Sequence, residues 1–246
     1  MAEPGSGVDR RSFTAIRWSQ DYCRDVRSTV GRVGMWKRNG LSIVLLAFLL
    51  VFLGGQIWTG FLTHNEELAE THRAALSLFD YLHSGHFVSA TFENWESEFL
   101  QMGMYVLLTV SLRQKGSAES RPLDDAQEQE RVEPGPTPWA VRRGGVWKML
   151  YGHSLAIAFT ALFLLSFSLH LAGSWRAEVD EQLAKGLPAP TCWEHLWSSS
   201  FWFESFQNWQ SEFLAVVALV ILTIFLRQKD SPQSKPLASP HSQTGD

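Results

Sequence analysis

The chain has 246 residues, a net charge of −4 and a pI near 6.1, which give no reason to expect a nucleic-acid partner. Its two cysteines exclude a disulfide framework. Eleven tryptophans favour membrane interfaces, where an apolar ring can keep its N–H in water.

Residues 1–35 are predicted to form a basic N-terminal extension in the cytoplasm. Apolar residues recur between Phe13 and Val33 at roughly helical spacing among arginines, which is typical of an amphipathic helix on a membrane surface. A disordered basic segment fits the same composition, and a start at Met35 would remove it from the mature protein. The sequence leaves these alternatives open.

Four apolar blocks follow. Residues 41–63 and 154–173 are each long enough to cross a hydrocarbon core about 30 Å thick. The other two are strictly apolar over only 14 residues, and they reach spanning length when extended back to 92–113 and 206–227. We therefore predict hairpin repeats at 36–115 and 147–229, a flexible cytoplasmic linker at 116–146, and a disordered cytoplasmic tail at 230–246.

The two hairpins share a repeated sequence. Residues 92–123 and 206–237 align without a gap at an offset of 114 residues and match at 18 of 32 positions. Such a duplication predicts the architecture directly. The expected fold is an all-α membrane protein with four transmembrane helices, arranged as two tandem hairpins that are parallel repeats.

Lysine and arginine in the flanks predict the orientation. Positive charges precede blocks one and three and follow blocks two and four, whereas the two remaining loops contain few. By the positive-inside rule, both termini and the central linker lie in the cytoplasm, and the two loops lie outside. Cys23 and Cys192 then lie on opposite sides of the membrane.

Counting inward from the outer surface places one polar residue of each span at a similar depth. These residues are Gln56, Glu98, His170 and Glu212. Ionisable groups at such a depth usually face the interior of a helix bundle or a water-filled cavity. They predict a candidate proton or cation site.

A structural interpretation of the same glutamates competes with this one. Both belong to a repeated Asn-Trp-x-Ser-Glu-Phe motif, in which the carboxylate complements a helix dipole, the asparagine caps the helix and the aromatic residues anchor it at the interface. The motif comprises Asn94, Trp95, Ser97, Glu98 and Phe99 in the first copy, and Asn208, Trp209, Ser211, Glu212 and Phe213 in the second. In this interpretation the motif serves for entry into the membrane, and a hydrogen bond between Glu98 and Gln56 would join two helices.

Metal and catalytic motifs are weak. His83, His86 and Glu93 are the best candidates for metal ligands, but the second copy lacks the two histidines, and interfacial loop histidines are the simpler explanation. We find no nucleotide-binding loop, zinc-ligand spacing or nucleophile triad. We therefore expect no cofactor and no enzymatic activity.

Four stretches resemble one family: Lys37–Ser42, Ser84–Phe87, Asn94–Gly103 and Leu112–Ser117. Over roughly residues 36–237 the chain is similar to the bacterial membrane-protein family known as domain of unknown function 6766. The resemblance implies a bacterial integral membrane protein with four spans, and it implies no activity. The second repeat departs from the first because Gln210 replaces Glu96 and nothing in the sequence corresponds to the Ser84-Gly85-His86 turn.

Three functions remain as hypotheses. The first is a non-catalytic structural or interaction protein of the bacterial inner membrane, in contact with the lipid bilayer. The second is a small transporter or channel that uses the polar layer, which would require a homo-oligomer because four spans enclose little volume. The third is a membrane-bound metal or redox protein.

Overall fold

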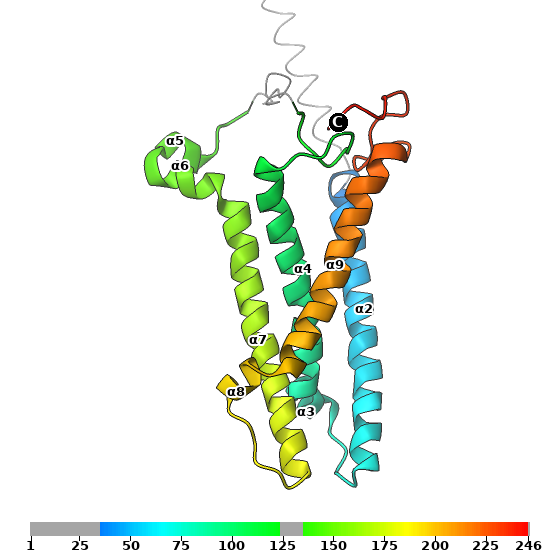
Figure 1. Ribbon diagram of the computed structural model, residues 1–246, viewed down its shortest axis with the longest axis vertical. Coiled ribbons are helices and arrows are strands. Elements are labelled where there is room, and N and C mark those ends of the chain that lie inside the picture. The colour runs from blue at the N-terminus through cyan, green and yellow to red at the C-terminus, as the bar shows by residue number, and fades with distance from the viewer. Residues whose placement is uncertain (1–34, 124–134, 246) are drawn as a thin grey trace, which may run out of the picture. The chain divides into compact units, whose positions relative to one another are not determined.

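The computed structural model describes residues 35–123 and 135–245, so the predictions for residues 1–34 and for the middle of the linker lie outside the described residues. The described chain is helical and contains no strand. Three helices are long and apolar enough to cross a membrane, which is compatible with a membrane protein (Figure 1). They are α2 (Met35–Glu70), α7 (Ser154–Ala184) and α9 (Ser199–Phe225).

The expected fourth span corresponds to α4 (Gly85–Ser111). Its 27 residues rise about 40 Å, which exceeds the thickness of a hydrocarbon core. It is nevertheless not among the helices that are apolar enough to cross by themselves. The reason is that its first half carries several ionisable and polar side chains, among them His86, Glu93 and Glu96. The prediction of four apolar spans is corrected to three apolar helices and one long polar-faced helix.

Two short helices precede the long ones at equal spacing. α3 (Leu78–Leu82) precedes α4, and α8 (Cys192–Leu196) precedes α9. The starts of α3 and α8 are 114 residues apart, and so are the starts of α4 and α9. Ser84 and Ser198 are the N-caps of the long helices, and each hydroxyl accepts the backbone N–H three residues later. The second copy therefore has a counterpart of the Ser84 turn, which the sequence comparison missed.

Both long helices begin earlier than predicted. α4 and α9 start at Gly85 and Ser199, seven residues before the predicted spans at 92 and 206. Asn94 is consequently not a helix cap, and its side-chain amide donates to the carbonyl of Ala90 inside α4 at 2.8 Å. The first two turns of each helix therefore also carry residues that can belong to a functional site.

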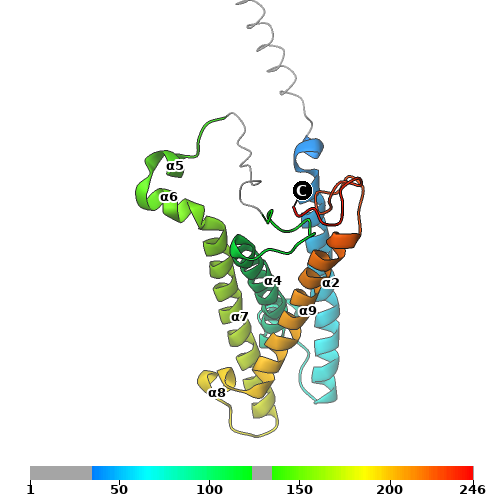
Figure 2. The same cartoon turned by 45° about the horizontal axis from the view of Figure 1, so that its top comes forward.

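The chain divides into two compact units, residues 1–59 and 60–246. The described part of the first is α2 up to Thr59. In the second, α4 packs chiefly against α7 and also against α9, as Figures 1 and 2 show. Small residues allow the closest approach, because a Cβ built on Gly173 would lie 2.5 Å from the backbone nitrogen of Ser89.

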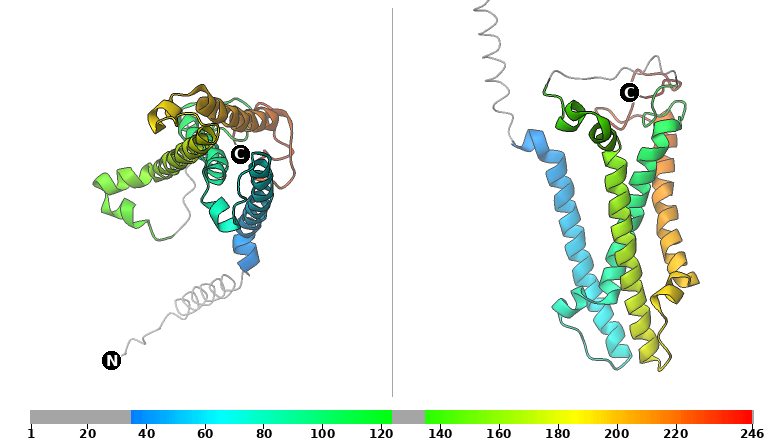
Figure 3. Two further views of the ribbon diagram at one scale, coloured as in Figure 1. Left: turned by 90° about the horizontal axis from the view of Figure 1, so that it is seen from below. Right: turned by 90° about the vertical axis from the view of Figure 1, so that its left-hand side faces the viewer.

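The second unit has two ends with different contents. The connections that contain α3 and α8 lie at one end, and α5 (Trp139–Arg143), α6 (Gly145–Gly152) and the segments that follow α4 and α9 lie at the other (Figure 3). The connection that contains α3 and the connection that contains α8 therefore lie at the same end of the unit.

Residues 230–245, predicted to be disordered, form successive turns in the structure. Lys235 is buried, and its ammonium group donates to the carbonyls of Gly116, His241 and Gln243. Burial lowers the pKa of Lys235 because the charged form loses its hydration. The three carbonyls match the three donors of an ammonium group, so this one side chain joins the tail to the segment after α4.

Candidate functional site: a buried histidine–carboxylate cluster

His170 of α7 is the centre of a polar cluster in the second unit. It is fully buried, and its Nδ1 lies 3.1 Å from Oε2 of Glu96, which is fully buried in α4. The other oxygen of Glu96 accepts the indole N–H of Trp209 in α9, also at 3.1 Å. Since a carboxylate accepts hydrogen bonds, Glu96 fixes a ring proton of His170 on Nδ1, and the other ring nitrogen, Nε2, faces away from Glu96.

Two further carboxylates, those of Glu204 and Glu93, lie near the ring of His170. Oε2 of Glu204 lies 3.7 Å from Nε2 of His170, and Nε2 is buried without a hydrogen-bond partner. Glu93 accepts the side-chain amide of Asn208. One atom each from Glu93, His170 and Glu204 lie within 4.8 Å of one another. The arrangement can hold a cation or a proton among these three groups.

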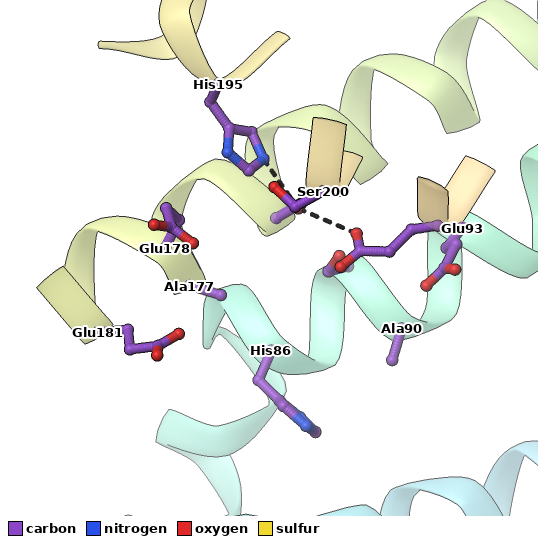
Figure 4. Close-up of a pocket in the computed structure, with 11 residues that line it drawn as sticks. His86, Ala90, Glu93, Ala177, Glu178, Glu181, His195 and Ser200 are labelled. Carbon is purple, nitrogen blue, oxygen red and sulfur yellow. Dashed lines mark hydrogen bonds between the residues drawn. The ribbon is translucent and has the colours of Figure 1, made fainter. Parts of the chain in front are cut away.

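Ser174 connects the cluster to α8. Its hydroxyl lies 2.9 Å from Nε2 of His195 and donates to Glu204 at 3.4 Å, the two dashed lines of Figure 4. Burial lowers the pKa of His195, because the charged form of the ring loses its hydration. The chain of hydrogen bonds therefore runs from His195 through Ser174 to Glu204.

A cavity of about 300 Å³ opens beside the cluster. Figure 4 shows Glu178 and Glu181 on one side of this cavity and Glu93 on another. Glu181 is exposed, and the side chain of Glu204 is 44% exposed, whereas His170 is fully buried. The cavity thus forms an acidic entry from the end of the helices that carries α8.

Each helix contributes side chains that lie one turn apart. Glu93 and Glu96 lie on α4, His170 and Ser174 on α7, and Glu204 and Asn208 on α9. Residues three or four apart on a helix share a face. Polar pairs at this spacing on three successive helices are the sequence signal that would have found the cluster.

The predicted polar layer is distributed differently from the cluster. His170 is shared by both, but the carboxylates close to it are Glu96 and Glu204, not Glu98 or Glu212. Glu98 is exposed on α4, and the backbone carbonyl of Glu212 accepts the side-chain amide of Gln101 at 2.7 Å. Gln56 belongs to the first compact unit.

The two copies of the repeated motif meet at the cluster. Asn208 and Trp209 of the second copy donate to Glu93 and Glu96 of α4. The motif serines make local bonds, from Ser97 to the carbonyl of Asn94 and from Ser211 to that of Asn208. The side chains of Trp95, Phe99 and Phe213 are partly buried.

The predicted metal ligands do not gather at one point. Nδ1 of His83 lies 2.8 Å from the carbonyl of Phe79, and the ring of His86 stacks on that of His64 at 4.6 Å between centroids. Glu93 instead belongs to the group around His170. A second group of nearby ligand atoms consists of His64, Glu67 and His86.

Comparison with known proteins gives one match. The sequence model of the family described as Domain of unknown function (DUF6766) matches residues 32–246. Neither the curated proteins nor the solved structures contain a match to the chain. Since the family model covers most of the sequence, the chain belongs to the family of domain of unknown function DUF6766.

Proposed function

We propose that the protein is a bacterial inner-membrane protein with four spans, in which α4 crosses the membrane together with the three apolar helices. The repeated sequence and the equal spacing of α3–α4 and α8–α9 support two tandem hairpins. The lysines and arginines near the ends that carry α5, α6 and the tail support cytoplasmic termini.

Its function, in this proposal, is to take a cation or proton from the outer face into the cluster around His170 and to pass it across the membrane, without catalysis. The carrying observation is the fully buried His170–Glu96 pair, with Glu93 and Glu204 beside it, because these two carboxylates also line a cavity. Ionisable groups inside apolar helices are costly to bury, and they commonly mark ion pathways.

Further polar residues continue along α4 beyond the cluster. Ser97 and Gln101 are buried, and Tyr105 lies one turn later, with its hydroxyl 3.2 Å from a carboxylate oxygen of Glu119. Polar side chains at intervals of four residues thus follow α4 toward its other end. Because one copy encloses little volume, we expect transport to require a homo-oligomer.

A structural role is the second candidate, because the same contacts join three helices. Asn208 and Trp209 connect α9 to α4, and His170 connects α7 to α4. Such bonds between helices stabilise bundles in membranes by about 0.6 kcal/mol each on average. A non-catalytic interaction protein would use the cluster in this way only.

Ion and proton flux into proteoliposomes distinguishes the candidates. Wild type is compared with His170→Gln and with the double variant Glu98→Gln/Glu212→Gln, each checked for folding by its elution volume and thermal unfolding. We expect flux in the wild type and in the double variant, and its loss in folded His170→Gln. A wild type without flux, and a less stable His170→Gln variant, would favour the structural role. Loss of flux only in the double variant would assign it to the layer predicted from depth.

A further inference from the structure

We infer that Glu93, Nε2 of His170 and one oxygen of Glu204 form a binding site for a divalent transition-metal ion. This inference deepens the proposed function and rests on it, because it names the cation that the cluster takes. One ligand atom each from Glu93 in α4, His170 in α7 and Glu204 in α9 lie within 4.8 Å of one another, and Nε2 of His170 is 3.7 Å from Oε2 of Glu204.

The unpartnered ring nitrogen points to a ligand. Nε2 of His170 is buried, has no hydrogen-bond partner and lies 3.7 Å from Glu204. A buried polar atom without a partner is costly, and nearly all such atoms in proteins are satisfied. A metal ion between Nε2 and the carboxylates would give this nitrogen a partner.

The second ring nitrogen is held as metal-binding histidines usually are. Nδ1 lies 3.1 Å from Glu96, and Glu96 is itself fixed by the indole N–H of Trp209. A carboxylate that accepts the Nδ1 proton orients the ring and makes Nε2 a better ligand. Asn208 on Glu93 and Ser174 on Glu204 hold the two carboxylates in the same manner.

Charge and donor type indicate the class of ion. Two carboxylates and a neutral imidazole balance a divalent cation. Donors of one nitrogen and two oxygens suit Zn²⁺, Mn²⁺, Fe²⁺ or Co²⁺, whereas Mg²⁺ and Ca²⁺ prefer oxygen alone and Cu⁺ prefers sulfur. Three protein ligands leave a further coordination position, and the neighbouring cavity of about 300 Å³ gives water or an exchanging ligand access to it.

The opening of the cavity is acidic as well. Glu178 and Glu181 line it together with Glu93 and Glu204 (Figure 4). Carboxylates at the entrance raise the local concentration of cations. The site can thus be loaded from the end that the proposed topology places outside.

The experiment uses the full chain in detergent, stripped with a chelator and then equilibrated with Zn²⁺. Bound zinc is measured by elemental analysis, and X-ray absorption of the wild type reports the ligands. We expect one zinc per chain at this site, with one imidazole nitrogen and otherwise oxygen ligands. Wild-type protein that binds no zinc, or zinc with sulfur or several imidazoles, would overturn the assignment.

Variants then locate the ion. His170→Gln and Glu204→Gln should each lose the zinc. Glu96→Gln should weaken binding about 10- to 100-fold, because Nδ1 and Trp209 face different terminal atoms of this side chain, and glutamine turns one of them into an NH2 group that cannot accept. His64→Gln is the matched control, since it alters the other group of nearby ligand atoms, and it should retain the zinc.

Folding and transport are separated from binding. Glu204 is partly exposed, so Glu204→Gln tests a ligand in a variant that should remain folded even if His170→Gln does not. Unchanged zinc in folded Glu204→Gln would contradict the inference. Flux of protons without zinc binding would overturn the metal site and leave the proposed transport intact, whereas zinc binding without any flux would do the reverse.

Discussion

Lys235 is a single residue with an unusual setting, a buried ammonium group surrounded by three carbonyls from two separate segments. We predict that Lys235→Met releases residues 230–245 from the segment after α4, because the three carbonyls lose their donor. A buried polar group left unsatisfied costs about 1–3 kcal/mol. Hydrogen exchange should show faster exchange at Gly116 and Gly245, whose amides bond to Thr244 and Ser117 respectively.

The control for this change is Lys229→Met, which removes an exposed lysine immediately before the same tail. Its exchange pattern should match that of the wild type. Equal protection of the tail in Lys235→Met and wild type would show that the turns persist without the buried ammonium group.

His170 also shows how far residue-level prediction reached. An ionisable side chain inside an apolar span could be recognised from the sequence alone, but its partners could not. Depth was counted along the helix axis, and it says nothing of direction around the axis. Glu98 lies only two residues beyond Glu96, which turns it by about 200° to another side of α4.

At the scale of the helix, the contact of α4 with α7 depends on Gly173. A Cβ at this position would lie 2.5 Å from the backbone nitrogen of Ser89 and 3.0 Å from its Cα. We predict that Gly173→Ala forces the two helices apart and destabilises the protein by about 1–3 kcal/mol. Thermal unfolding in detergent measures this as a lower Tm.

Gly152→Ala provides the comparison, because a Cβ at Gly152 meets nothing within 4 Å. Its Tm should equal or slightly exceed that of the wild type, since alanine favours helix over glycine. If both alanine variants unfolded at the same temperature, the close approach at Gly173 would not contribute to stability.

The boundaries of the helices were predicted less well than their existence. Apolar blocks placed the long helices correctly along the chain, but the predicted starts at 92 and 206 missed the first two turns. Those turns carry polar residues, and hydropathy does not distinguish a polar helical turn from a loop. Glu204 was overlooked for this reason, since it lies two residues before the predicted span.

For the whole molecule, the two cysteines report the orientation. Cys192 is a free, exposed thiol at the start of α8, and Cys23 lies in the N-terminal extension. We predict that a membrane-impermeant maleimide labels Cys192 in intact cells, and that it labels Cys23 only after the inner membrane is permeabilised.

Cys23→Ser and Cys192→Ser assign each signal to one thiol. Labelling of Cys23 in intact cells, with Cys192 protected, would reverse the proposed topology. Labelling of both thiols in intact cells would place the two on the same side and exclude an odd number of crossings between them.

The all-helical architecture followed from the sequence because apolar blocks and polar segments alternate strongly. The family membership followed from local motifs in the same way. The polar cluster did not, because it is built from pairs on three helices that only the packing of α4 against α7 and α9 brings together. Similarly, the order of the tail could not be predicted, because Lys235 of the tail contacts Gly116, which lies 119 residues earlier in the chain.

The polar face of α4 has a consequence for biosynthesis. If α4 crosses the membrane as proposed, a nascent chain that ends before α7 presents Glu93, Glu96 and Gln101 to lipid, since their partners lie on helices not yet synthesised. The translocon would then release the first hairpin with α4 only loosely inserted. Stable integration of α4 would wait until the second hairpin emerged from the ribosome, so that the two halves of the chain assemble as one unit.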